Sequence, residues 1–300
     1  MRKILFIIIL SVLGICAFIS CNEHKRPTID EELSQPTTEE PSQTTTEEPS
    51  QPTIEELSQP TIEEPSQPTT DGPSQPVTDI DGNVYKTVKL GNQVWMAQNL
   101  RTTRYADGRK IPLGTTESFD VAYRYYPNNN RANVSKYGYL YNWAAVMNGS
   151  ASSESNPSGV QGICPNGWHV PSDAEWTELT NYVSSQSQYV CGSDEDNIAK
   201  ALASEVGWNN NTENCAVGDN PSTNNATGFS ARPAGGYDGY DDYEDYGGYF
   251  YFGYYASFWS ATQYFGKYAY TRNLYYDNAS VYRDNYDYKN NGYSVRCVRN

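Results

Sequence analysis

The stretch CPNGWHVPSDAEW at residues 164–176 is the part of the sequence that most constrains the fold. After Pro171, Ser172 is followed three residues later by Glu175, the arrangement of a capping box at a helix N-terminus. Apolar side chains then recur on one face of the expected helix: Trp176, Leu179 and Val183. The segment therefore predicts an amphipathic helix that packs on a core.

Strand patterns precede and follow this helix. In residues 81–100, DGNVYKTVKLGNQVWMAQNL, apolar and polar side chains alternate around a turn at Gly91-Asn92. This alternation predicts an antiparallel hairpin and a folded domain that begins near Ile80. Further short strands are expected at residues 137–143, 258–262 and 293–298.

A second helix is expected at residues 193–207. Ser193 and the acidic residues after it suit a helix N-terminus, and Gly207 ends the pattern. One face carries an apolar stripe: Ile198, Leu202 and Val206. Taken together, these patterns predict an α+β domain with two helices and short antiparallel strands.

The first 21 residues have the pattern of an export signal. Met1-Arg2-Lys3 precedes an apolar run from Ile4 to Ile19, which is short for a membrane span. Cys21 follows Ser20 directly, and a Cys after a small residue at this point is typical of lipoprotein cleavage and acylation. Cys21 is therefore the predicted lipidation site.

Two alternatives to lipidation at Cys21 stay open. Cys16 is a second candidate anchor, although it lies inside the apolar run, and plain cleavage with secretion is the other alternative. With Cys21 acylated, the protein would be an outer-membrane lipoprotein exposed at the cell surface. Its membrane partner would be reached through the lipid, without a spanning segment.

Residues 22–78 are expected to be a disordered stalk. An eight-residue unit recurs there: SQPTTEEP from Ser34, SQTTTEEP from Ser42, SQPTIEEL from Ser50, SQPTIEEP from Ser58 and SQPTTDGP from Ser66. Such units contain too few apolar side chains to offset the entropy of ordering, while proline and like charges extend the chain. A stalk that lifts residues 79–300 off a membrane is the favoured interpretation, and repeat drift without function is the alternative.

The net charge of −15 belongs mainly to this stalk. Residues 27–82 hold 14 acidic residues and no Lys or Arg, whereas residues 83–300 hold 21 acidic and 17 basic residues. The folded part therefore has no basic footprint for nucleic acid, and no nucleic-acid partner is expected.

Tyrosine dominates the last fifth of the chain. Between Tyr237 and Tyr293 lie 17 of the 27 tyrosines, among Asp, Asn and Gly. Tyr offers a large, stiff contact area with a polar tip, which evolved binding surfaces favour. The alternative is that these rings only cover a small core. The predicted binding residues are Tyr237, Tyr240, Tyr243, Tyr246, Tyr249, Tyr251, Tyr254, Tyr255, Tyr264, Tyr268, Tyr270, Tyr275, Tyr276, Tyr282, Tyr286 and Tyr288.

Four cysteines lie in the expected domain, and export makes two disulfides plausible. Four cysteines allow three pairings; the favoured one joins Cys164 to Cys297 and Cys191 to Cys215. The spacing contains no CxxC pair, so neither a zinc site nor any other metal site is expected. His169, close to Cys164, is expected to be a packed residue before the helix.

Six ordered blocks give the chain a family resemblance. They are GNQVWMAQNLRTTRYADG, YGYLYNWAAV, CPNGWHVPSDAEW, GFSARPAGG, FWSAT and NGYSVRCVRN. From about Thr78 to Asn300 the chain resembles the Fibrobacter succinogenes major paralogous domain. The resemblance implies a C-type-lectin-like fold, similar to formylglycine-generating-enzyme-like domains, in exported lipoproteins or secreted surface proteins without an established activity.

The resemblance does not bring the lectin calcium signatures with it. Trp208-Asn209-Asn210 is the segment most similar to these signatures, and it lacks the carboxylate that calcium prefers. An acidic loop could hold Ca²⁺, but its spacing favours a solvated loop: Asp238, Asp241, Asp242, Glu244 and Asp245.

Enzymatic function is not expected. No hydrolase, zinc-protease, P-loop or dinucleotide fingerprint occurs, so no cofactor is expected either. Glu175 and Glu178 are expected on the exposed side of the helix, and nothing selects them as a catalytic pair.

The function expected is a non-catalytic, surface-anchored module whose tyrosines recognise an extracellular glycan or protein. Some proteins that resemble this fold are targets of diversity-generating retroelements, which mutate adenines in Asn codons near the gene's end. YYDNASVYRDNYDYKNNGY, followed by the tail SVRCVRN, would suit such diversification. A structural subunit or tip of a cell-surface assembly is the second hypothesis, and an unrecognised hydrolase is the third.

Overall fold

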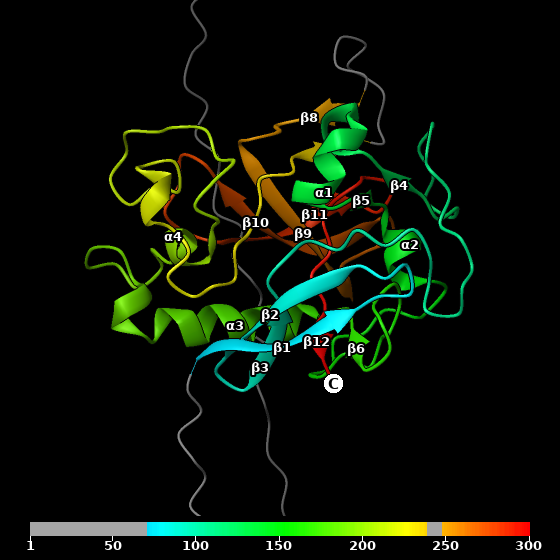
Figure 1. Cartoon of the computed structure of the whole chain (residues 1–300), viewed down its shortest axis with the longest axis horizontal. Helices are drawn as coiled ribbons and strands as arrows, with labels where there is room; N and C mark the ends of the chain where they lie inside the picture. The colour runs from blue at the N-terminus through cyan, green and yellow to red at the C-terminus, as the bar shows by residue number, and fades with distance from the viewer. Residues whose placement is uncertain (1–70, 239–247) are drawn as a thin grey trace, which may run out of the picture. The chain divides into compact units, whose positions relative to one another are not determined.

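Five strands form the larger sheet, in the order β1-β2-β3-β12-β6 (Figure 1). The computed structural model describes residues 71–238 and 248–300. The strands of this sheet are β1 (Gly72–Thr78), β2 (Val84–Leu90), β3 (Gln93–Met96), β6 (Trp168–His169) and β12 (Val298–Arg299). Because β12 lies between β3 and β6, the first and last strands of the domain belong to one sheet.

The hairpin predicted around Gly91 is confirmed as β2 and β3, with Val88 opposite Trp95. Gly91 adopts φ +58° at the turn, and a Cβ there would stand 2.9 Å from the ring of Tyr182. Both the backbone angle and the close ring therefore require glycine at this position.

The start of the domain differs from the prediction. Strand β1 occupies residues 72–78, which the sequence assigned to the stalk, so the ordered chain starts before Ile80. The reason lies in the last octad, where Asp71-Gly72 replaces the Glu pair of earlier units. Asp71 accepts hydrogen bonds from the hydroxyls of Tyr182 and Tyr189, at 2.7 and 3.0 Å. These bonds fix the chain where β1 begins.

Helix α3 (Asp173–Ser184) is the longest helix of the described residues and begins with the predicted capping box. Ser172 Oγ accepts the backbone N–H of Glu175, whose carboxylate in turn accepts the N–H of Ser172. The apolar face of α3 packs in a core cluster between the larger sheet and a second, three-stranded sheet, contributing Trp176, Leu179 and Val183.

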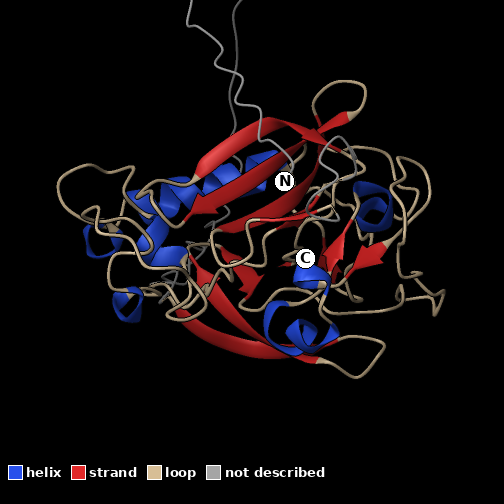
Figure 2. Ribbon diagram, turned by 90° about the horizontal axis from the view of Figure 1, so that it is seen from above, coloured by secondary structure: helices blue, strands red, loops and turns tan. Residues whose placement is uncertain are grey.

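The second sheet has the order β11-β10-β9 and is antiparallel throughout. Figure 2 shows its strands on the far side of the domain from β1 and β2. Its strands are β9 (Tyr255–Gln263), β10 (Tyr268–Tyr275) and β11 (Tyr282–Tyr288). The strand predicted at residues 258–262 is thus confirmed within a longer β9.

The second predicted helix is mostly wrong. Only α4 (Ala199–Leu202) is helical, because the backbone N–H of Cys191 donates to Asn197 and holds the preceding segment in a loop. Ser204 then donates its N–H to Ala231, which turns the chain away. Val206, expected on the apolar stripe, is therefore 48% exposed.

Several short elements complete the domain. The described residues contain four α-helices rather than the expected two, with α1 (Val134–Tyr137) and α2 (Trp143–Met147) as additions. The strand predicted at 137–143 shrinks to β5 (Leu140–Tyr141), which pairs with β4 (Arg124–Tyr125). A last pair is β7 (Gly236–Tyr237) with β8 (Tyr249–Phe250). The 3₁₀ helices are η1 (Pro127–Asn129), η2 (Arg131–Asn133), η3 (Ser187–Tyr189) and η4 (Pro221–Thr223). The mixed α+β class is confirmed.

Both favoured disulfides are present. Cys164 is bonded to Cys297, and Cys191 is bonded to Cys215. The first bond joins the segment before β6 to the residue before β12, so it links two neighbours in the larger sheet. The second closes the segment of residues 191–215, which contains α4.

Arg296 lies at the centre of the domain with no exposed surface. Its guanidinium donates to Asn99 Oδ1 and to the backbone carbonyls of Met96, Phe229 and Ser230, at 2.6 to 2.9 Å. Burial, followed by the nearby Arg232, lowers the pKa of Arg296 well below its usual range. Four acceptors from two distant segments therefore converge on one side chain of the C-terminal tail.

Candidate functional site

The predicted binding tyrosines are exposed or partly buried wherever the structure describes them. Three of the predicted binding residues fall outside the described residues: Tyr240, Tyr243 and Tyr246. Five of the others are exposed: Tyr251, Tyr254, Tyr264, Tyr282 and Tyr286. The remaining eight are partly buried: Tyr237, Tyr249, Tyr255, Tyr268, Tyr270, Tyr275, Tyr276 and Tyr288. None of the described set is fully buried, in contrast with Tyr293 at 5% exposure.

Five rings gather near the start of β10 and the end of β11, and we refer to them as the turn cluster: Tyr264, Tyr268, Tyr270, Tyr286 and Tyr288. Tyr268 stands directly opposite Tyr288 across the two strands, with ring centroids 4.7 Å apart. Tyr286 contacts Tyr264 and Tyr268 at 5.4 and 5.6 Å. These distances are typical of favourable edge-to-face and tilted ring pairs.

An ion-pair network joins the turn cluster to helix α3. The guanidinium of Arg283 lies 4.3 Å from the ring centre of Tyr270 and 2.9 Å from a carboxylate oxygen of Asp173. Arg272 also binds Asp173, at 2.5 Å. Burial alone would raise the pKa of Asp173, but the hydrogen bonds and charges of the two arginines outweigh it and hold that pKa below its usual value. The ring of Tyr270 therefore packs on an arginine that is ion-paired to the start of helix α3.

Four rings gather at the other end of β10, and we refer to them as the strand-end cluster: Tyr251, Tyr255, Tyr275 and Tyr282. Tyr251 stacks on Tyr255 at 4.3 Å, and Tyr255 stands opposite Tyr275 across β9 and β10. Tyr275 in turn contacts Tyr282 at 5.0 Å. Burial, and then the charge of nearby carboxylates, raises the pKa of Tyr275, so its hydroxyl is a donor at neutral pH.

The two clusters do not form one continuous surface. Tyr268 and Tyr275 mark the two ends of β10, and a strand rises about 3.3 Å per residue, so they lie roughly 23 Å apart along it. Between them, the side chains of β10 from Thr271 to Leu274 are buried. The single tyrosine surface predicted from the sequence is thus divided into two patches.

Two of the predicted binding residues pack inward. The ring of Tyr237 stacks at 4.0 Å on Tyr125, which has no exposed surface, and contacts Tyr249 at 5.0 Å. Burial is the main cause that raises the pKa of Tyr249 to about 12. For these rings the alternative of core covering fits better than ligand contact, while Tyr254 and Tyr276 form a separate surface pair at 4.8 Å.

His169 is a packed residue, as predicted, but the expectation for Glu175 is wrong. Glu175 is 2% exposed because its carboxylate turns back over the helix start. It accepts the N–H of Ser158 and Ser172, and its other oxygen lies 2.6 Å from His169 Nε2. Burial lowers the pKa of His169, but the hydrogen bond and charge of Glu175 outweigh it and raise that pKa above its usual value.

The polar atoms of this pair are taken up by neighbouring groups of the domain. The other ring nitrogen of His169 lies 2.7 Å from Asn300 Oδ1, so both nitrogens are engaged. The nearby hydroxyl, Ser158 Oγ, donates to the carbonyl of Val170. We therefore assign the pair a structural role, which ties β6 and the chain's last residue to α3.

No group of three or more His, Cys, Asp or Glu in residues 71–238 and 248–300 is placed to hold a metal ion. The candidate calcium loop lies outside the described residues except for Asp238. Trp208, in the segment that is most similar to the lectin calcium signature, is buried and donates its indole N–H to the carbonyl of Ala231. Over the same ranges, the helices are all too short or too polar to cross a membrane.

Phe265 is a surface residue that the sequence analysis missed. It lies between β9 and β10, next to Tyr264 of the turn cluster, and is 74% exposed. The signal was available in Phe265-Gly266-Lys267, an aromatic residue beside a glycine turn between two strands. An exposed phenyl ring at a turn extends the apolar area of this cluster.

The fold and this surface define a disulfide-linked α+β domain with exposed aromatic clusters at both ends of one strand. The chain belongs to the Fibrobacter succinogenes major domain family, whose model matches residues 88–299. No curated protein and no solved structure matches the chain.

Residues from several of the blocks that carry the family resemblance contact one another in the core. Arg296 of the last block binds Met96 and Asn99 of the first block and Phe229 of the fourth. The indole N–H of Trp259, in FWSAT, donates to the carbonyl of Tyr141 in the second block, at 2.8 Å. Family membership therefore accounts for the packing and does not locate a ligand.

Proposed function

We propose that this protein is a surface-anchored lipoprotein whose C-terminal domain binds an extracellular glycan or protein through its tyrosine clusters, without catalysis. One observation carries the proposal: the described tyrosines of the turn and strand-end clusters are all at least partly exposed. Tyr286 is 64% exposed and Tyr251 is 55% exposed, although rings of this size gain free energy when buried. Ordered, exposed aromatic rings are typical of binding surfaces.

The proposal is tested with the full chain, purified in detergent, and two double variants. Tyr264→Ser with Tyr286→Ser changes the turn cluster, and Tyr251→Ser with Tyr282→Ser changes the strand-end cluster. Each is measured against an array of neutral, sialylated and sulfated glycans and against surface proteins of neighbouring cells. A hot-spot loss of about 2 kcal/mol corresponds to about a 30-fold weaker Kd.

The matched control is Val84→Ser, because Val84 is 54% exposed on β2, outside both clusters. We expect the control to keep both binding and melting temperature. Binding that survives both double variants would contradict the proposal. A large drop in melting temperature in the double variants would instead support the interpretation that these rings cover a core.

A second function, a subunit of a cell-surface assembly, draws on the same exposed rings and on Phe265. Recovery of the chain in a stable complex with other envelope proteins, together with binding to no glycan on the array, would favour it. Loss of that complex in the turn-cluster variant would then locate the contact.

Lipid anchoring at Cys21 is part of the proposal and is supported by the export signal. The test is metabolic labelling with an alkyne fatty acid, followed by fractionation of the outer membrane. We expect Cys21→Ser to lose the label and to leave the membrane fraction, whereas Cys16→Ser keeps both. Exposure on the cell surface is tested separately, by protease treatment of intact cells.

Diversification by a retroelement is a sharper form of the proposal. It is supported by the contrast between Tyr282 and Tyr286, which are exposed, and the tail residues Ser294 and Cys297, which have no exposed surface. Variation in the first set would change the surface and spare the core. The test is the DNA downstream of the gene, where a near-identical repeat should differ only at adenines and a reverse transcriptase should lie nearby; without these the idea is dropped.

The C-type-lectin-like fold is likewise a proposal. It is supported by the first and last strands lying in one sheet, with the disulfide Cys164–Cys297 beside β6 and β12. Superposition of this sheet on the sheets of lectin domains is the test, and a different strand order in those domains would refute the assignment.

A further inference from the structure

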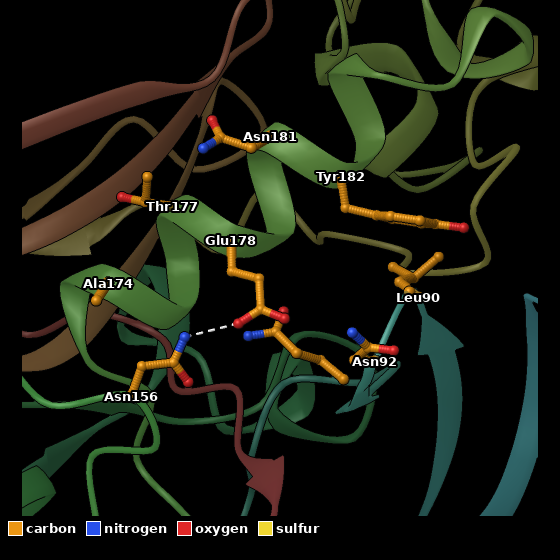
Figure 3. A pocket seen from close by; sticks show the side chains of 10 residues that line it. Leu90, Asn92, Asn156, Ala174, Thr177, Glu178, Asn181 and Tyr182 are labelled. Atoms are coloured by element: carbon orange, nitrogen blue, oxygen red, sulfur yellow. Dashed lines mark hydrogen bonds between the residues drawn. The ribbon is translucent and has the colours of Figure 1, made fainter. Parts of the chain in front are cut away.

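An open groove lies beside helix α3, next to the turn between β2 and β3 (Figure 3). Its volume is about 630 Å³, within the range of roughly 300–1,000 Å³ in which small-molecule sites fall. Polar side chains reach it from three segments: Asn92 at the turn, Asn156 in the loop before β6, and Glu178 and Asn181 on α3. No residue of the turn or strand-end cluster lines it.

Several polar side-chain atoms that line the groove make no hydrogen bond within the described part of the domain. Asn156 Nδ2 donates to Glu178 Oε2 at 2.6 Å (Figure 3). The other atoms of this pair, Asn156 Oδ1 and Glu178 Oε1, make no hydrogen bond among the described residues, and neither do the side-chain amides of Asn92 and Asn181. A primary amide has two donors and one acceptor oxygen, so the groove offers both kinds of partner to a ligand.

Gln93 differs from these residues because both polar atoms of its side chain are hydrogen-bonded within the domain. Its Nε2 donates to the carbonyl of Glu175 at 3.0 Å, and its Oε1 accepts the indole N–H of Trp95 at 3.0 Å. Gln93 is buried, and its amide therefore belongs to the wall of the groove. Asn92, its chain neighbour, is exposed and has none of these bonds.

The ring of Tyr182 forms one side of the groove and is held in place by a hydrogen bond. Its hydroxyl donates to Asp71 at 2.7 Å, and its ring lies against the backbone of Gly91. Asp71 also accepts the N–H of Gly91 at 3.1 Å, so one carboxylate fixes both the ring and the turn beneath it. A ring held in place before binding loses little conformational entropy when a ligand packs on it.

The charge of the groove restricts its ligand. Among the described residues that line it, Glu178 is the only charged one, and neither Lys nor Arg is among them. An anionic ligand would therefore meet a carboxylate without a compensating cation. A neutral ligand with many hydroxyl groups fits better, because hydroxyls both donate to carboxylate oxygens and accept from amide N–H groups.

We propose that this groove binds a neutral oligosaccharide. The C–H face of one sugar ring would pack on Tyr182, and its hydroxyls would reach Glu178 and the amides of Asn92 and Asn181. The site is distinct from both tyrosine clusters, and the inference does not depend on their proposed role.

The test uses the full chain in detergent and a fixed set of probes. These are linear tetrasaccharides of glucose, mannose, galactose and xylose, with sialyllactose, oligogalacturonate and a lysine-rich peptide as charged alternatives. Binding is detected by saturation-transfer NMR and its Kd is measured by calorimetry. We expect at least one neutral tetrasaccharide to bind and the acidic saccharides not to bind.

Two variants and two matched controls locate the binding. Glu178→Gln and Asn181→Ala should each weaken it roughly threefold to tenfold, the range expected for one hydrogen bond. The controls Glu154→Gln and Asn210→Ala make the same kinds of change at exposed positions outside the groove, and they should bind as the parent does. Because both groove variants replace side chains at the surface of α3, urea unfolding should show an unchanged midpoint.

Each other outcome overturns the inference. Binding of no neutral tetrasaccharide, binding of the acidic saccharides or the peptide alone, or equal Kd values in groove variants and controls would each do so. Sugar binding lost in the Tyr264 and Tyr286 double variant, but kept in Glu178→Gln, would place the ligand at the turn cluster. That result would support the proposed function and refute the groove.

Discussion

Replacing Arg296 by lysine should lower the free energy of unfolding by roughly 2–6 kcal/mol, although the net charge stays the same. The guanidinium has no exposed surface and donates to four acceptors, three of which are backbone carbonyls. It also lies 4.6 Å from the ring centre of Phe229. No ion pair of the described residues includes it, so hydrogen bonds and ring contacts alone compensate its burial.

The magnitude follows from the number of acceptors that lysine cannot reach. An ammonium has three donors on one nitrogen, whereas these four acceptors surround a planar group. We expect about two acceptors to lose their partner, at about 1–3 kcal/mol for each buried group left unpaired. The stronger hydration of an ammonium adds to the cost of burial.

The assay is guanidinium unfolding, followed by the fluorescence of the buried Trp95 and Trp259. The matched control is Arg299→Lys, because Arg299 lies three residues further on and is exposed. We expect the control to stay within about 0.5 kcal/mol of the parent. A loss below about 1 kcal/mol for Arg296→Lys would refute the argument that this fork of hydrogen bonds holds the core segments together.

Three further outcomes are expected. Because the pKa of His169 is raised in the folded state, its pair with Glu175 contributes stability that is complete below pH 6.5 and is lost as pH rises through the folded pKa. Urea unfolding at several pH values should show this loss, and Glu175→Gln should make the free energy of unfolding less dependent on pH over this range. Cys191→Ala opens a disulfide that spans 24 residues and should cost roughly 3 kcal/mol in chemical unfolding; an unchanged midpoint would mean that the segment around α4 is held by other contacts. Asp71→Asn weakens the hydrogen bond from Tyr182 and should cost about 1 kcal/mol, with faster amide exchange in β1; slow exchange in that variant would show that pairing with β2 alone holds β1.

Local patterns predicted the parts of the fold that depend on neighbouring residues. The capping box at Ser172 and the turn at Gly91 depend on side-chain and backbone requirements within a few positions, and both are present. The second helix failed because its extent depends on distant partners: the loop held at Cys191 delays its start, and the contact of Ser204 with Ala231 ends it early. Helix propensity is a property of the local sequence and does not include such tertiary contacts.

The sequence predicted that the candidate site is rich in tyrosine, but it did not predict which tyrosines lie next to one another. A run rich in tyrosine indicates a surface, but strand register decides which rings meet, and it divided them between the two ends of β10. The groove escaped the sequence analysis altogether, since Asn92, Asn156 and Asn181 are ordinary polar residues in separate segments. Only packing of α3 beside the β2–β3 turn brings them together.

By itself the sequence determined the first helix and the hairpin, because each depends on short spacing. The export signal and the repeat as far as residue 70 lie outside the described residues and stay predictions from composition. The sequence also favoured the disulfide pairing that the structure contains. The tertiary structure alone decided that Asp71 fixes the start of β1, that Glu175 turns inward to His169, and that Arg296 collects acceptors from distant segments. The contacts of Asp71 and Arg296 join residues far apart in the chain, and the contact of Glu175 with His169 requires both side chains to be buried. The free energy of all three arises only when folding removes the partners together from water.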